Sequence, residues 1–245
     1  MAADYKSTEI LGVRIDAVTP EQALALALKS LKGRRPYTIF TAGPEFLMNA
    51  KKDPDFKRIL NNSNLVVADG IGAVYASKLN EIKIKSRVTG CDLLQAIFAE
   101  IRETGETVYL FGGKPGIPEL VAEKSKELHP GLKIAGMHNG YFDDLEEMLI
   151  IDDIIDKKPD ILLVGLGSPK QEKWIAKNKK RLPAKLLIGV GGSFDVMSGK
   201  LGRAPKIFQK LGLEWLYRLI RQPSRIKRQI VLPKFVFAVL RERFR

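Results

Sequence analysis

The chain has 245 residues, of which 45% are hydrophobic, and it carries a formal net charge of +13. This composition is ordinary for a soluble protein and supplies enough apolar residues for a proper core. The single cysteine, Cys91, excludes an intramolecular disulfide, and with only two histidines it argues against a structural zinc site. We therefore expect a protein of the reducing cytoplasm.

The positive charge is concentrated at the C-terminal end. Residues 200–245, called the basic C-terminal segment below, hold thirteen Lys and Arg but only two acids, a net charge of +11. Residues 1–199 are close to neutral, at +2. This asymmetry predicts a globular body with a basic appendage that contacts a nucleic acid, an anionic membrane surface or a phosphorylated substrate.

Strand and helix patterns alternate along the body. A hairpin pattern at residues 9–18 precedes a helix at 21–31. Apolar strand runs follow at 38–41, 65–68, 108–111, 134–136, 161–165 and 186–190. Helical patterns lie at 45–61, 72–79, 92–103, 118–128, 145–156 and 170–180, and after Gly202 the pattern is purely helical.

This alternation predicts an α/β fold: a Rossmann-like, mainly parallel sheet with helices on both faces. We expect a catalytic body at residues 1–199 and a basic helical C-terminal appendage at 200–245. The N-terminus shows no basic stretch followed by an apolar run, so no signal peptide is expected. No stretch reaches the roughly 18 apolar residues of a membrane span.

Glycines follow most of the predicted strands. Ligands of open parallel sheets bind outside the carboxyl ends of the strands, and glycine there lets backbone N–H groups approach a phosphate. Gly112 and Gly192 hold such positions. Each glycine taken alone is explained equally well by a turn between strand and helix. Several such loops on one edge favour a phosphorylated ligand, most simply a nucleotide.

The standard nucleotide fingerprints are missing from these loops. No G-x-G-x-x-G follows a strand, and no G-x-x-x-x-G-K-[ST] occurs, which argues against a hydride-transfer enzyme and a P-loop ATPase. The pair Asp53 and Asp55 resembles a metal-binding D-x-D, but it lies in a Lys-rich helical segment away from the predicted edge. A solvated helix break is the favoured interpretation there.

Asp69 ends an apolar strand and precedes Gly70-Ile71-Gly72, so its carboxylate is expected on the ligand edge. Two roles fit this position. Asp is a preferred N-cap residue for a following helix. A carboxylate beside an apolar strand end can also deprotonate a sugar hydroxyl as a general base.

Several stretches resemble the WecG/TagA/CpsF glycosyltransferases, glycosyltransferase family 26. They are ILGVRIDAV at 10–18, ADG at 68–70, RVTGCD at 87–92, HNGYF at 138–142, GLGSPKQEKW at 165–174, GGSFD at 191–195, RAP at 203–205 and GLEWLYRLI at 212–220. The resemblance covers residues 8 to about 235, and the stretches at 165–174 and 212–220 are highly specific.

The resemblance implies inverting transfer of a sugar from a UDP-sugar to a polyprenyl-diphosphate-linked acceptor, at the inner face of the membrane. In members that resemble TagA, the donor is UDP-N-acetylmannosamine and the acceptor carries N-acetylglucosamine. It further implies Asp69 as general base, Thr41 as its polar neighbour and Arg87 as a donor-holding residue. The substrate-binding residues that it implies are Gln171, Tyr141, which stacks on uracil, Asp195, and Arg218, Arg225 and Arg228, which close over the site.

One position departs from the family. Where the family commonly reads T-P-N-A-E, residues 41–45 read TAGPE, so Gly43 replaces the usual pocket asparagine. This puts the sugar contact at residue 43 in doubt, and with it the identity of the sugar. The resemblance implies that no metal or other cofactor is needed, so we expect arginine side chains to take over the charge stabilisation at the diphosphate.

Residues 203–222 place Ile207, Leu211, Trp215 and Leu219 at helical spacing between basic residues. Such an amphipathic pattern fits a helix packed on the body, or one that lies on anionic lipid. A nucleic-acid-binding protein that uses the basic C-terminal segment is the alternative function. The aromatic residues follow an apolar stripe, which suits lipid or the protein core better than nucleic acid. We therefore expect peripheral membrane binding and no nucleic acid. The family resemblance also implies a homo-oligomer.

Overall fold

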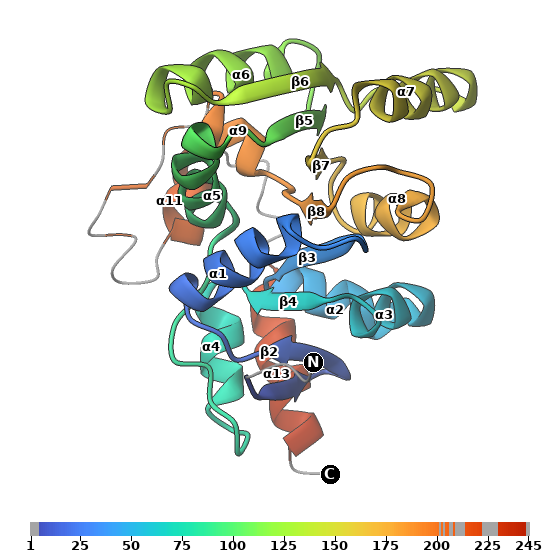
Figure 1. Cartoon of the computed structure of the whole chain (residues 1–245). Helices are drawn as coiled ribbons and strands as arrows, with labels where there is room; N and C mark the ends of the chain where they lie inside the picture. Colours follow the sequence, from blue (N-terminus) through green and yellow to red (C-terminus); the bar gives the residue numbers. More distant parts are fainter. Residues whose placement is uncertain are drawn as a thin grey trace.

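The computed structural model describes residues 5–200, 202, 204–205, 208, 214–221 and 230–243. A six-stranded parallel sheet, in the order β4-β3-β8-β7-β5-β6, forms its centre (Figure 1). The α/β fold predicted from the sequence is confirmed, and every predicted strand is present. In chain order the strands are β3 (Tyr37–Ala42), β4 (Leu65–Ala68), β5 (Thr107–Gly112), β6 (Lys133–His138), β7 (Ile161–Gly165) and β8 (Leu186–Gly189).

Helices cover both faces of the sheet, and each face has its own apolar core (Figure 1). Strands β4, β7 and β8 are almost entirely buried, which is why they read as continuous apolar runs. One face is covered by α1 (Pro20–Leu31), α5 (Gly90–Thr104), α6 (Ile117–Leu128) and α9 (Ser193–Met197). The other core includes α2 (Pro44–Lys52), α3 (Pro54–Asn61), α4 (Ile71–Ser77), α7 (Asp144–Lys157), α8 (Lys170–Asn178) and α13 (Val231–Arg243).

The helix predicted at residues 45–61 is in fact two helices. Pro54 lacks an N–H, so the chain breaks at Asp53 and restarts as α3. The Asp53 carboxylate accepts a hydrogen bond from the Phe56 N–H at 2.9 Å and pairs with Lys173 at 2.6 Å. The interpretation of this D-x-D as a helix break is therefore confirmed. The short helix α9 was not predicted.

Helix α13 brings part of the basic C-terminal segment onto the body. Phe235 and Ala238 are buried in the same core as α2 and α4. A Cβ on Gly72 would lie 2.7 Å from Pro44 and 3.8 Å from the Phe235 ring, so glycine allows α4, α2 and α13 to approach closely. The C-terminal helix thus takes part in the folded core.

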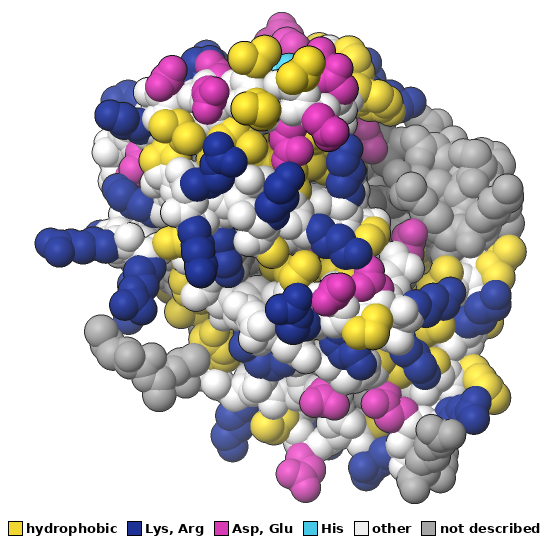
Figure 2. Space-filling model, turned by 90° about the vertical axis from the view of Figure 1, so that its right-hand side faces the viewer, with side chains coloured by type: hydrophobic (Ala, Val, Ile, Leu, Met, Phe, Trp, Pro, Cys, Tyr) yellow, Lys and Arg dark blue, Asp and Glu magenta, His cyan; other side chains and the backbone are white. Residues whose placement is uncertain are grey.

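The surface is mixed in charge. On the face that Figure 2 shows, apolar and acidic side chains gather at the top, where α7 lies, and Lys and Arg side chains lie over the middle and lower parts. Exposed apolar side chains of α7 include Leu145, Met148 and Leu149. Among the helices that the structure describes, none is both long and apolar enough to cross a bilayer.

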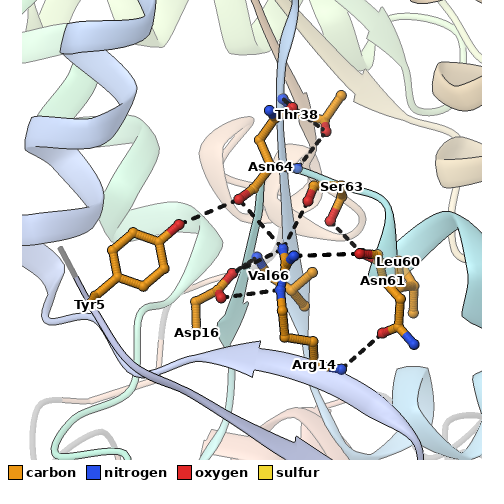
Figure 3. A network of polar contacts seen from close by, with 9 residues as sticks. All are labelled: Tyr5, Arg14, Asp16, Thr38, Leu60, Asn61, Ser63, Asn64 and Val66. Carbon is orange, nitrogen blue, oxygen red and sulfur yellow. Dashed lines mark hydrogen bonds and ion pairs between the residues drawn. The ribbon is translucent and has the colours of Figure 1, made fainter. Parts of the chain in front are cut away.

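A polar network fastens the N-terminal hairpin to the sheet (Figure 3). The hairpin consists of β1 (Ser7–Ile10) and β2 (Val13–Asp16), as the sequence predicted. The buried Asp16 carboxylate accepts from the Val66 N–H of β4 at 2.8 Å and pairs with Arg14 at 3.2 Å. Arg14 also donates to the Ser63 carbonyl oxygen at 2.8 Å. The network therefore satisfies backbone groups at the start of the edge strand β4.

We predict that Asp16→Ala lowers the free energy of unfolding by about 3 kcal/mol, because it leaves the buried Val66 N–H without its acceptor and removes the ion pair of the partly buried Arg14. Urea unfolding measures the change. Asp55→Ala, which breaks an exposed pair with Arg58, is the control and should cost less than about 0.5 kcal/mol. Equal effects of the two substitutions would contradict a structural role for the network.

Candidate active site

A cavity of about 480 Å³ opens at the carboxyl ends of β4, β3, β8 and β7. This volume is within the range of small-molecule sites, and its position is where open parallel sheets bind ligands. Five residues singled out from the sequence line it: Thr41, Asp69, Arg87, Gln171 and Gly192. The topology thus brings together residues that are up to 151 positions apart in the chain.

Thr41 and Asp69 come from neighbouring strands. Thr41 lies in β3 opposite Val67 of β4, and Asp69 directly follows β4, with its N–H donating to the Ala42 carbonyl oxygen at 3.0 Å. Gly70, with a φ of 109°, occupies the N-cap position of α4. Asp69 is therefore not the N-cap residue, and of the two roles considered for it, the N-cap interpretation is wrong.

Gly43 lines the same cavity. It is the N-cap of α2 and is followed by Pro44 at the first helical position. A Cβ at residue 43 would lie 2.9 Å from the Asp69 carbonyl oxygen, which is closer than side chains normally approach backbone. The backbone as arranged here therefore has no room for the asparagine that the family commonly has at this position.

Arg87 joins the cavity to the basic C-terminal segment. Its guanidinium forms an ion pair of 2.5 Å with Glu214, the first residue of α11 (Glu214–Arg221). The two side chains are only 20% and 16% exposed. Glu214 and Trp215 from α11 and Leu232 from α13 line the cavity together with Arg87. The C-terminal helices thus form one wall of the site.

The N-terminal end of α5 forms another wall. Thr89, Gly90 and Cys91 line the cavity, and the Thr89 side chain caps α5 by accepting from the Asp92 N–H. A Cβ on Gly90 would lie 2.9 Å from the Ser193 hydroxyl, which also faces the cavity. The N–H groups at such a helix start favour an anionic ligand.

Gln171 and Glu172, in the first turn of α8, form a buried pair beside the cavity. Gln171 Nε2 donates to Glu172 Oε1 at 2.6 Å, and Gln171 Oε1 accepts from the Gly191 N–H at 3.0 Å. Burial raises the pKa of Glu172 to about 7, and the contacts with Gln171 and Ser168 oppose this shift only partly. Glu172 was not singled out from the sequence, although it lies in the specific stretch at 165–174.

Three predicted substrate-binding residues lie outside the cavity lining. Gly112 ends β5, and a Cβ there would lie 2.4 Å from the Gly165 backbone of β7, so its glycine is required for close packing. Tyr141 is 63% exposed, and Asp195 is half-buried in α9. The loop that carries Tyr141 adjoins Gly112, since the Gly140 N–H donates to the Gly113 carbonyl oxygen. The binding roles of these three residues stay predictions.

The predicted arginines of the C-terminal segment are described in part. Arg218 belongs to α11, but its side chain lies outside the described structure, as do Arg225 and Arg228 altogether. Glu214 and Trp215 of the same segment, which the sequence did not indicate as site residues, do face the cavity. Within the described residues, no cluster of three or more His, Cys, Asp or Glu side chains could hold a metal ion.

We predict that the stability of the protein falls between pH 5 and pH 8 because of Glu172. Its folded-state pKa of about 7 exceeds its ordinary value of 4.5, so the folded state holds this proton more tightly than the unfolded chain does. The contribution to stability is complete below the ordinary value and is lost as the pH rises through about 7. Relative to Glu172→Gln, the wild type should lose about 2 kcal/mol more over this interval in urea unfolding. If the free energy of unfolding changes with pH in the same way in both proteins, the raised pKa is wrongly assigned to Glu172.

Comparisons with known proteins show which family the chain belongs to. The model of the glycosyl transferase WecG/TagA/CpsF family matches residues 8–245. The chain is 38% identical over 204 residues to the N-acetylglucosaminyldiphosphoundecaprenol N-acetyl-beta-D-mannosaminyltransferase of Bacillus subtilis (strain 168). The matched region covers 83% of this chain and 79% of the relative. It is 37% identical to the enzyme of the same name from Bacillus spizizenii, over 83% of this chain and 78% of that relative. This chain belongs to the WecG/TagA/CpsF family of glycosyltransferases.

Proposed function

We propose that this protein transfers N-acetylmannosamine from a UDP-sugar to N-acetylglucosamine linked to a polyprenyl diphosphate, in the synthesis of a bacterial cell-surface polysaccharide or teichoic acid. Both relatives carry the name of a transferase of this sugar. The observation that carries the proposal is the gathering of Asp69, Thr41, Arg87 and Gln171 around one cavity at the strand ends.

In the proposed reaction, the acceptor hydroxyl attacks C1 of the donor sugar from the side opposite the diphosphate. Asp69 accepts the hydroxyl proton, the new C1–O bond forms, and the bond to the diphosphate oxygen breaks, with UDP leaving as the anion. Because attack and departure occur on opposite faces, the configuration at C1 is inverted. Thr41, on the strand adjacent to the one that Asp69 follows, lines the same cavity, and we assign it a contact with the same sugar.

Stabilisation of the departing UDP is assigned to positive groups around the cavity. Arg87 can donate two parallel hydrogen bonds to phosphate oxygens, and the first turn of α5 adds backbone N–H groups. Arg218, Arg225 and Arg228 are proposed to add to this charge. No step of the reaction is assigned to a metal ion.

A transfer assay tests the function. Radiolabelled UDP-N-acetylmannosamine is supplied with a short-chain analogue of N-acetylglucosaminyl-diphospho-undecaprenol, in parallel with UDP-glucose and UDP-N-acetylglucosamine. Product from the first donor, unchanged by EDTA, supports the whole proposal. Product from another donor alone would reassign the sugar, with Gly43 as the first residue to substitute. A rate that EDTA abolishes would overturn the metal-free mechanism.

Asp69→Asn is expected to reduce transfer at least about 100-fold, because general-base catalysis contributes that much and an amide cannot accept the proton. Calorimetric titration with UDP should show nearly unchanged affinity, since the carboxylate acts on the acceptor. Near-normal turnover of the variant would remove Asp69 from the mechanism.

We also propose that α13 holds the enzyme peripherally on the inner face of the cell membrane, within reach of a lipid-linked acceptor. The helix buries Phe235 and Ala238 against the body and exposes Val236, Phe237 and Leu240, with Lys234 and Arg241 beside them. An exposed apolar stripe flanked by cations is suited to anionic lipid. Leu232 of the same helix lines the cavity, so membrane contact and active site would be close. Self-association into a homo-oligomer is a further part of the proposal.

Phe237→Ser is expected to weaken binding to phosphatidylglycerol vesicles about tenfold, because one large apolar side chain no longer enters the interface. Vesicle co-sedimentation measures the change, and added salt should weaken binding of both proteins. Leu145→Ser on α7, at a side chain that is 75% exposed, is the matched control and should bind like the wild type. Equal losses in the two variants would argue against α13 as the contact.

A further inference from the structure

The carboxyl group of Glu172 is held in an unfavourable environment. The residue has no solvent-exposed surface, and its Oε2 has no hydrogen-bond partner in the described structure. A buried carboxyl group of this kind costs folding free energy, whereas a neutral side chain of similar volume would fill the same space without that cost. Packing alone therefore does not account for a glutamate at residue 172.

What the carboxyl group does is visible in its contact with Gln171. Glu172 Oε1 accepts from Gln171 Nε2 at 2.6 Å, while the other end of the same carboxamide accepts from the Gly191 N–H at 3.0 Å. The Gly191 N–H can only donate, so it selects the amide oxygen. Glu172 Oε1 accepts when the carboxyl group is ionised, and also when the proton is on Oε2, so it pairs with the amide nitrogen. The two contacts together fix which way round the Gln171 side chain lies.

The surroundings leave space for this arrangement. Gly189, at the end of β8, has no side chain, and a Cβ there would lie 2.9 Å from Gln171 Nε2 and 3.3 Å from Glu172 Oε1. Gln171 is 4% exposed, yet it lines the cavity. The loop that it holds through Gly191 continues into Gly192 and Ser193, which line the cavity as well.

We propose that Glu172 is a positioning residue for the transfer reaction: it orients the Gln171 carboxamide and, through it, the loop at residues 191–193. Glu172 itself does not line the cavity and acts through Gln171. The catalytic consequence rests on the function proposed above, whereas the effect on the loop does not. The buried carboxyl group thus lowers the stability of the fold, and in return it fixes one wall of the cavity.

The test uses Glu172→Met, which has similar volume and no acceptor, together with Gln171→Met and the double variant. We expect Glu172→Met to be at least as stable as the wild type in urea unfolding. The Gly191 amide should exchange with deuterium about tenfold faster, and kcat/KM should fall about 10- to 100-fold, the loss expected for a hydrogen bond to a charged group. In the Gln171→Met background, adding Glu172→Met should cause no further loss, because the residue that transmits the effect is already gone.

Two further variants make each outcome decisive. Glu147→Met removes a carboxylate that pairs with Lys177 near the other end of α8, and it should leave Gly191 exchange and kcat/KM unchanged. Glu172→Asp keeps the acid but withdraws it from Gln171 by one methylene, so it should speed Gly191 exchange even if the Met variant does not fold.

If the Gly191 amide of the folded Glu172 variants exchanges with deuterium at the wild-type rate, the inference is overturned. Equal losses of kcat/KM from Glu172→Met in the wild-type and Gln171→Met backgrounds would also overturn it. A wild-type protein without transferase activity would instead overturn the proposed function, and the exchange measurement would still test the positioning role.

Discussion

The site depends on the parallel alignment of six strands. Parallel pairing places the carboxyl ends of all strands at the same edge of the sheet, so residues from distant parts of the chain meet there. β3 lies between β4 and β8, and the three strands end beside one another. This alignment brings together Thr41, Asp69 and the loop after Gly189. The helices that follow these strands need not contact one another for this to happen. Chemistry at this edge is thus a result of topology more than of any single motif.

The second determinant of the site comes from outside the sheet. The Arg87–Glu214 ion pair, which spans 127 positions in sequence, and Leu232 of α13 bring two helices of the basic C-terminal segment to the cavity wall. α13 is fixed by Phe235 in the core, so the wall is anchored by apolar burial as well as by charge. The same segment that carries most of the net charge therefore also shapes the cavity.

The sequence predicted the strands well, because strands buried on both faces leave continuous apolar runs that do not depend on distant partners. The single helix expected over residues 45–61 was wrong, because the break at Asp53 and Pro54 that the D-x-D already indicated divides it into two helices. Five of the predicted site residues share one cavity, and each lies at the carboxyl end of a strand or in a stretch that resembles the family.

Glu172 and Glu214 were not predicted. Their roles depend on burial and on partners that tertiary folding brings close. A local sequence pattern contains no information about either. A glutamate in the first turn of a helix is usually exposed, and its negative charge interacts favourably with the helix dipole. Only the packed structure distinguishes Glu172, with no exposed surface, from such a residue.

Gly43 has a consequence for any attempt to redesign the enzyme. Because a Cβ at residue 43 would meet the Asp69 carbonyl oxygen at 2.9 Å, a larger side chain on this wall must displace the backbone that carries the proposed base. A substitution at residue 43 that changes sugar selectivity would then also change the catalytic rate. Engineering a new donor preference at residue 43 would require a second, compensating change after β4, so the two loops have to be varied as a single unit.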